Sequence, residues 1–534
     1  MTRLPTLTRR DWGATLAAMA ALGAAPGRLF AQGEPRWWRD GRPAPIAREA
    51  LHLLEDSPSH GLTPADYGVP ALRQALARAD TGGGLPSDET ERMERALTSA
   101  FIQFLLDLHQ GRVSPSDLAY RFSPARRSGF DAGALLRQAA AAGDLRRAVR
   151  EAVPPLTQYE RLRQALAVYR GLSGHPAWQQ ALPRLPARRG ERDAPLEPGQ
   201  PWDGLPQVAA RLAALGDLAD ATKTGTSLDG RLLQALRAFQ RRHGQLDDGR
   251  LGRATWSALN VTPAQRTRQL ELALERLRWT PLWQGPRMLA INLPEFVLRG
   301  YEIVDGRIQV RLQMKVIVGR ASVTRTPLFD EAMRTVEFQP FWNVPRSIAR
   351  DEVVPRLRRD PGYWAREGFE FVDGAGRADP ALSDAGLQAV LDGRLRIRQR
   401  PGPRNALGDI KFVFPNRDAV YLHHTPSTQL FERSRRDFSH GCIRVEQPVA
   451  LARFVLQDLP GWDEPRIRQA MAQDAPSTVR LPAPLPVLIA YGTALVKDAG
   501  VHFFEDIYGH DRRLEEALRR RPHPVIDGLR GPLR

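Results

Sequence analysis

Cysteine is almost absent from this chain, because Cys442 is the only one in 534 residues. A single thiol excludes an intramolecular disulfide, and it also excludes the paired-cysteine zinc sites of small metal-binding domains. No run of eighteen apolar residues follows the N-terminal region, so the sequence predicts no membrane span in the mature chain. We expect no metal and no other cofactor.

Acidic residues are also outnumbered, with 60 Asp and Glu against 77 Lys and Arg and a formal net charge of +17. Such a balance favours anionic partners, although an arginine bias of the whole proteome would produce it too. The sequence contains no zinc finger, RNA-recognition motif or clustered basic helix, so we expect no nucleic-acid partner. Hydrophobic residues make up 42% of the chain and charged residues 26%, which is typical of globular proteins, and the length predicts three or four units.

The single cysteine lies in a polar setting. Residues 439–444 read Ser-His-Gly-Cys-Ile-Arg, and His423 stands nineteen positions before Cys442. A lone cysteine is usually a small buried apolar residue. The nucleophilic form is the thiolate, and a thiol with an ordinary pKa of about 8.5 ionises only slightly near neutral pH, so a nearby histidine has to accept its proton. The histidines and polar neighbours favour a reactive thiol over an inert one.

Two motifs provide a family resemblance. They are Ser-His-Gly-Cys-Ile-Arg at 439–444 and Tyr-Leu-His-His-Thr-Pro at 421–426. Their order and spacing around a sole cysteine resemble L,D-transpeptidases of the YkuD type, in particular the large multi-domain branch typified by YcbB. These enzymes cross-link peptidoglycan through an active-site cysteine.

The resemblance implies a catalytic role for four residues. Cys442 would be the nucleophile and His423 the proton acceptor and donor. His424, which stands where the branch often has Asp, would orient the His423 ring through its backbone carbonyl. The backbone N–H groups of Gly441 and Cys442 would stabilise the oxyanion of the tetrahedral intermediate.

Three further residues of the motif are candidates for substrate binding: Ser439, His440 and Arg444. His440 is interpreted as shaping the cleft, with a role as general base as the alternative. Arg444 has two open roles, a bidentate contact to a substrate carboxylate and support of the loop.

The first half of the chain reads as helical. Over residues 35–190, apolar positions recur at helical spacing between Pro and Gly breaks, which predicts helices at 44–56, 69–79, 87–109, 133–153 and 157–172. This block resembles the helical scaffold domain of the YcbB branch. Residues 203–262 resemble a three-helix peptidoglycan-binding domain, with Phe239-Gln240 and Gly252-x-x-Thr255 as markers that build the fold, so no binding residue is named there.

The catalytic domain is predicted at 287–462. Strand-like runs dominate residues 287–345 and 396–445, and Asp305-Gly306 is a hairpin signal. Residues 346–395 read as helix and loop and resemble an insertion that caps the substrate cleft. Residues 463–534 form a C-terminal extension, with a helix and a last strand at 485–491, that completes the domain. The fold class is therefore multi-domain α+β: a helical scaffold, a small three-helix module and a mainly β domain with a helical insertion.

Residues 1–31 resemble an export signal. Arg9 and Arg10 precede an apolar run that is too short to span a membrane, and small residues follow up to Ala31. The paired arginines resemble a twin-arginine signal, which predicts a periplasmic protein. An ordinary secretory signal and an uncleaved anchor are the alternatives.

The resemblance implies a reaction and a substrate. It predicts a thioester acyl-enzyme on Cys442 and 3→3 cross-links between peptidoglycan tetrapeptide stems in cell wall biogenesis, with other cell-wall synthases as further partners to consider. Two alternatives stay open: a YkuD-type hydrolase or amidase acting on stem peptides or wall-linked lipoprotein, and a non-catalytic wall-binding scaffold. A papain-like hydrolase is disfavoured because His423 precedes Cys442, whereas the papain order is the reverse.

Overall fold

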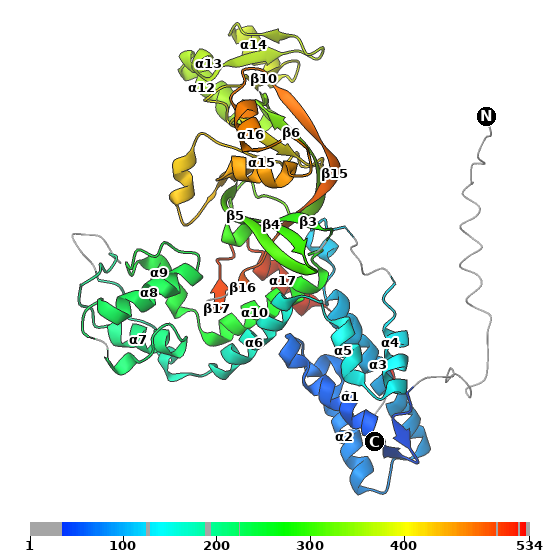
Figure 1. The fold of residues 1–534 in the computed structure, drawn as a ribbon. Coiled ribbons are helices and arrows are strands. Elements are labelled where there is room, and N and C mark those ends of the chain that lie inside the picture. The colour runs from blue at the N-terminus through cyan, green and yellow to red at the C-terminus, as the bar shows by residue number, and fades with distance from the viewer. Residues whose placement is uncertain are drawn as a thin grey trace, which may run out of the picture.

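The computed structural model describes residues 35–123, 129–186, 194–223, 225–282, 284–497, 500–521 and 524–529. The predicted leader at 1–31 lies outside these residues. Figure 1 shows the helical N-terminal part, a small helical module, a β domain and a cap at the far end of that domain, which confirms the multi-domain α+β class. Within the described residues, no helix combines the length and apolarity needed to cross a membrane.

The N-terminal part packs its first five α-helices around one apolar core that includes Trp37, Phe101 and Phe104. The helix predicted at 133–153 is two helices, because Gly143 adopts a φ of 66° and the Asp144 side chain then caps the next helix by accepting a hydrogen bond from Arg147 N–H at 2.9 Å. The elements are β1 (Trp38–Arg39), β2 (Arg42–Pro43), α1 (Pro45–Glu55), α2 (Val69–Thr81), α3 (Ser87–Gln110), α4 (Ala132–Ala142), α5 (Leu145–Ala152) and α6 (Thr157–Gly171).

The small module consists of α7 (Leu205–Ala214), α8 (Gly230–Arg242) and α9 (Arg253–Asn260) around a core of its own. Its marker residues build the fold, as expected. Phe239 is buried in that core, and the buried Gln240 amide accepts a hydrogen bond from Gly249 N–H at 2.9 Å and donates one to Arg250 O at 3.0 Å. These bonds hold the loop between α8 and α9.

Helix α10 (Pro263–Trp279) connects the module to the other parts. Thr262 and Gln265 form a capping box at its start, with Pro263 at the first helical position. Its apolar residues share a small core with α6, β16 (Ala494–Lys497) and β17 (Gly500–Phe503). The two strands form a hairpin after residues 485–491, so the prediction that those residues hold the last strand was wrong. The hairpin consists of two four-residue strands, too short to give a clear alternating pattern.

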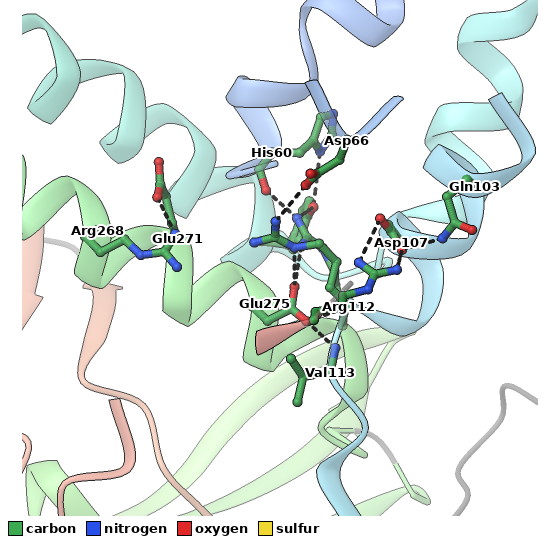
Figure 2. A network of polar contacts seen from close by, with 12 residues as sticks. His60, Asp66, Gln103, Asp107, Arg112, Val113, Arg268, Glu271 and Glu275 are labelled. Atoms are coloured by element: carbon green, nitrogen blue, oxygen red, sulfur yellow. Dashed lines mark hydrogen bonds and ion pairs between the residues drawn. The ribbon is translucent and has the colours of Figure 1, made fainter. Parts of the chain in front are cut away.

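A buried network of charges joins α10 to the N-terminal part (Figure 2). Arg278 Nη1 donates to Glu275 Oε2 at 2.9 Å, and both side chains are almost completely buried. Glu275 Oε1 also accepts hydrogen bonds from the backbone N–H groups of Arg112, at 2.5 Å, and Val113, at 3.1 Å. The network links the N-terminal part to α10. Removal of one partner would leave an uncompensated buried charge and would destabilise this contact.

The β domain is one nine-stranded sheet with the order β13-β5-β14-β12-β11-β6-β15-β3-β4, and it closes on itself because β4 also pairs with β5. Asp305 and Gly306, both with positive φ, connect β4 to β5 as predicted. The strands are β3 (Arg287–Asn292), β4 (Val297–Val304), β5 (Arg307–Gly319), β6 (Phe329–Phe338), β11 (Ile410–Val413), β12 (Leu422–His423), β13 (Asp437–Ser439), β14 (Ile443–Val445) and β15 (Ser477–Ala490), and the helices that follow or flank the sheet are α15 (Pro448–Leu456), α16 (Glu464–Met471) and α17 (His510–Arg520).

The cap differs from the helix-and-loop prediction, since it also contains a four-stranded sheet with the order β7-β10-β8-β9. Strand β8 reads Phe-Glu-Phe-Val and is buried throughout, and it packs with Trp364 in a separate core. Charged residues flank this four-residue strand, so the sequence shows no clear strand pattern there. The elements are β7 (Trp342–Asn343), α11 (Arg346–Ile348), the π-helix η7 (Ala349–Val353), α12 (Val354–Arg359), α13 (Gly362–Glu367), β8 (Phe369–Val372), β9 (Ala378–Asp379), α14 (Asp384–Leu391) and β10 (Arg396–Gln399).

Candidate active site

Strand pairing brings the two sequence motifs together. Strands β12 and β14 are parallel neighbours, with Leu422 opposite Ile443 and His423 opposite Arg444. Ile443 N–H donates to Tyr421 O at 3.0 Å. Cys442 is the residue directly before β14, so the thiol lies where that strand begins and the imidazole lies on the strand beside it.

The turn that presents Cys442 is held by side-chain hydrogen bonds. Gly441 adopts a φ of 118°, which L side chains rarely adopt. The Ser439 hydroxyl donates to Cys442 O at 2.5 Å and accepts from Gly441 N–H at 3.1 Å, and the Thr326 hydroxyl donates to Gly441 O at 2.8 Å. Ser439 is buried and therefore shapes the turn from within.

Both motifs line one cleft of about 630 Å³ between the sheet and the cap. Its size falls in the range of ligand-binding sites. Six of the seven residues singled out by the sequence line it: His423, Ser439, His440, Gly441, Cys442 and Arg444. His424 instead turns toward Asp409, with its Nδ1 2.6 Å from the Oδ1 of that carboxylate.

His423 is buried, with its ring oriented by the backbone. Its Nδ1 lies 2.6 Å from the carbonyl oxygen of His424, and this contact assigns the proton to Nδ1. Burial lowers the pKa of His423 to about 3, and the nearby Arg444 guanidinium acts in the same direction. The imidazole is therefore neutral near pH 7, with Nε2 free of a proton and able to accept one.

Cys442 is half-buried, and its thiol donates a long hydrogen bond to Ala419 O at 3.6 Å. Burial raises the pKa of Cys442 above its ordinary value, while hydrogen bonds from Tyr421 oppose that rise. Among the described residues, no hydrogen bond joins Sγ to His423. The resting site thus contains a neutral thiol and a neutral imidazole on the walls of the same cleft.

Comparison with known proteins agrees with this geometry. Residues 286–478 match the family of the L,D-transpeptidase catalytic domain of the YkuD type. Residues 286–478 form a YkuD-type L,D-transpeptidase catalytic domain. Residues 30–166 match a scaffold domain, and residues 203–259 match a family described as "Putative peptidoglycan binding domain".

A curated Haemophilus influenzae protein named "Putative L,D-transpeptidase" is 33% identical over 254 residues, which are 47% of this chain and 50% of that protein. The chain thus covers about half the length of that relative. A crystal structure of an L,D-transpeptidase (residues 123–326) from Xylanimonas cellulosilytica is 16% identical and aligns with 58% of this chain and 100% of that chain, at a TM-score of 0.18.

Arg444 is an unpaired cation in the cleft of the YkuD-type domain. In the described part of the chain it forms no ion pair with a carboxylate, and its buried Nε has no hydrogen-bond partner. Burial lowers the pKa of Arg444 from its ordinary value, yet an arginine remains charged near pH 7. An anionic group of a ligand would supply the missing counter-ion.

His440 connects the cap to the turn that presents Cys442. Its Nε2 lies 2.6 Å from Oε1 of Glu352, which belongs to η7 of the cap. The motif that presents Cys442 therefore also contacts the segment that covers the cleft, and this contact fits the cleft-shaping role expected for His440.

Among the other residues that line the cleft, Lys411 and Tyr421 were not singled out by sequence reasoning. Lys411 pairs with His423 across β11 and β12, its Nζ lies 4.6 Å from the centre of the Tyr421 ring, and it forms an ion pair with Glu337 at 3.0 Å. Burial raises the pKa of Tyr421, and the neighbouring Cys442 acts in the same direction. The available signal was a lone lysine in the otherwise apolar strand Ile410–Val413.

Proposed function

We propose that this protein is a peptidoglycan L,D-transpeptidase that forms 3→3 cross-links between stem peptides. The observation that supports the proposal is the placement of Cys442 and His423, on neighbouring strands, in the wall of one cleft of about 630 Å³. The matched YkuD-type domain and peptidoglycan-binding module agree with it.

The reaction is an acyl transfer in two steps. His423 Nε2 accepts the thiol proton as Cys442 Sγ attacks a carbonyl carbon of the donor stem. The C–N bond of that peptide breaks, a thioester forms, and the imidazolium returns its proton to the leaving amine. The amine of a second stem then attacks the thioester, which forms the new peptide bond and releases the thiol.

The state of the two groups determines when the proton moves. Because the pKa of His423 is about 3 and the pKa of Cys442 is raised, the neutral pair is the stable resting form. Proton transfer then accompanies attack on the bound substrate, as general base catalysis requires. The contact between Nδ1 and His424 O favours the tautomer with its proton on Nδ1.

The developing oxyanion needs preorganised donors. The backbone N–H of Cys442 is the first of these in our proposal. Gly441 N–H is the second, and since it donates to the Ser439 hydroxyl at 3.1 Å in the resting site, its use requires that bond to open. Arg444 binds a carboxylate of the stem peptide, with His440 shaping the cleft beside it. We also propose that the leader at 1–31 directs export of the protein to the periplasm.

The test uses purified muropeptides with tetrapeptide stems. The wild-type protein is expected to form 3→3 dimers, and Cys442→Ala is expected to form none while it still binds sacculi. A carbapenem should acylate the wild-type protein at Cys442, as seen by intact mass. Dimers formed by the Cys442→Ala variant would contradict the mechanism, and stem trimming that ignores an added amine acceptor would identify a hydrolase instead.

A further inference from the structure

A second cleft, of about 560 Å³, lies where the small module meets the YkuD-type domain. Its walls come from the loop after α8, from α9, from the turn before β4, from residues 434–435 and from the tail around β17. Figure 1 shows β16 and β17 between the module and strands β3 to β5. The second cleft shares no lining residue with the cleft at Cys442. Junctions of this kind are frequent sites of ligand binding.

The wall formed by the tail and the catalytic domain is apolar and close to the module. Phe296, Phe503 and Phe504 line this wall and are nearly completely buried. A Cβ added at Gly244 would lie only 3.0 Å from Phe504, so the loop after α8 approaches the tail as closely as a glycine permits. The wall is thus a packed surface that presents ring and backbone atoms to a ligand.

One cation in the cleft, Arg266, has no counter-ion among the residues that the structure describes. The Arg266 guanidinium donates only to neutral acceptors, Gln269 Oε1 at 2.8 Å and Ala258 O at 3.3 Å, and lies 4.5 Å from the centre of the Phe503 ring. No carboxylate among the described residues forms an ion pair with it. Burial lowers the pKa of Arg266 to about 10, which leaves the group charged near pH 7.

The other arginine of the cleft, Arg435, has carboxylate partners. Arg435 donates to Asp437 Oδ1 at 2.7 Å and to Glu505 Oε1 at 3.1 Å. The cleft therefore offers one unpaired, half-buried positive charge beside an apolar wall. A ligand that complements it has a carboxylate next to small apolar groups.

We propose that this cleft binds a carboxylate-bearing stem peptide of peptidoglycan, with the carboxylate on Arg266 and its alanine methyl groups against Phe296 and Phe504. The inference rests on the proposed function for the identity of the polymer. It assigns the ligand site to the junction of module and catalytic domain rather than to the free face of the module. The protein would then hold the wall at one cleft while Cys442 acts at the other.

The test adds a negative charge at the rim of the cleft. Ser257 is exposed and lines the cleft, and Ser257→Gln is the matched control because it has the size of Ser257→Glu without the charge. All variants are made in the Cys442→Ala background, and binding is measured by co-sedimentation with purified sacculi. We expect Ser257→Glu to weaken binding about tenfold and Ser257→Gln to weaken it much less. Thr226→Glu, at an exposed position of the module outside the cleft, should bind normally.

Two further measurements make the result decisive. Sacculi with carboxylates blocked as methyl esters should bind unmodified protein as weakly as native sacculi bind Ser257→Glu. Cross-linking of soluble muropeptides by Ser257→Glu with Cys442 intact should equal wild type. Equal binding of native and esterified sacculi, or equal binding by the Glu and Gln variants, would overturn the inference. If Ser257→Glu weakens sacculus binding as expected but the protein with Cys442 intact forms no cross-links, only the proposed function is overturned.

Discussion

Two regions of the molecule bury arginine side chains, and they differ in whether the described residues supply a carboxylate partner. At the junction in Figure 2, Arg278 has Glu275, Arg112 has Asp66, and Arg521 has Asp107 at 3.0 Å. In the cleft at Cys442, Arg444 has no carboxylate partner in the described chain. The arginines at the junction thus have carboxylate partners within the chain, whereas Arg444 has none among the described residues.

This difference separates charged residues that stabilise the fold from charged residues that are candidates for binding or catalysis. A paired buried charge keeps two parts in one arrangement and loses much stability when one partner is removed. An unpaired charge in a cleft costs stability, and together with a neutral imidazole that can accept a proton it marks a candidate functional site. Variants at the two regions should therefore affect different measurements.

His423→Gln should show the largest effect on catalysis. The amide cannot accept the thiol proton, so the rate of cross-linking should fall about 10²- to 10⁴-fold while the thermal unfolding temperature stays close to wild type. The measurement is kcat on soluble muropeptides. A decrease of less than tenfold would show that another base serves Cys442.

Glu275→Gln should show the largest effect on stability. It leaves Arg278 buried without a counter-ion and should lower the free energy of unfolding by about 3–5 kcal/mol, measured by urea denaturation. The partly exposed Glu464, which pairs with Arg468 at 2.7 Å, is the control, and Glu464→Gln should leave the free energy of unfolding nearly unchanged. Equal losses in the two variants would remove the distinction between buried and exposed pairs, and the folded Glu275 variant should retain its kcat.

Arg444→Gln should raise KM for the donor stem about ten- to a hundredfold, because a charge-assisted contact to a carboxylate is lost. Arg444→Lys keeps the charge and should recover part of the affinity. If Arg444 only supports its loop, the unfolding temperature will fall and KM will not depend on whether the donor carboxylate is present.

The pH dependence of Cys442 alkylation tests the neutral resting pair. Because the pKa of Cys442 is raised above its ordinary value, the thiolate fraction should rise about tenfold from pH 7 to pH 8 and continue to rise beyond pH 9. The measurement is the rate of iodoacetamide modification of the wild-type protein. A plateau below pH 8 would indicate a preformed thiolate and imidazolium pair.

Asp409→Asn should have the smallest effect. The amide keeps a hydrogen bond to His424 but removes the negative charge, so the carbonyl that orients His423 is held less firmly and kcat should fall about fivefold. KM should stay unchanged, since Asp409 does not line the cleft. A change in KM without a change in kcat would contradict this positioning role.

Much of the fold was predictable from the sequence. The helices of the N-terminal part and the hairpin at Asp305-Gly306 follow from local patterns that repeat every 3.6 or 2 residues. Strands in the cap and the β16–β17 hairpin were missed, because runs of four residues or fewer between charged residues do not show such a pattern.

The sequence by itself determined which chemistry is available: one thiol, a histidine nineteen residues before it, and a glycine at the turn between Ser439 and Cys442. Only the tertiary structure decided that β12 lies beside β14, that Lys411 and Tyr421 join the cleft, and that no carboxylate of the described residues pairs with Arg444 or Arg266. The physical reason is that residue types and their spacing are local properties, whereas pairing, burial and the absence of a counter-charge depend on segments that are distant in the chain.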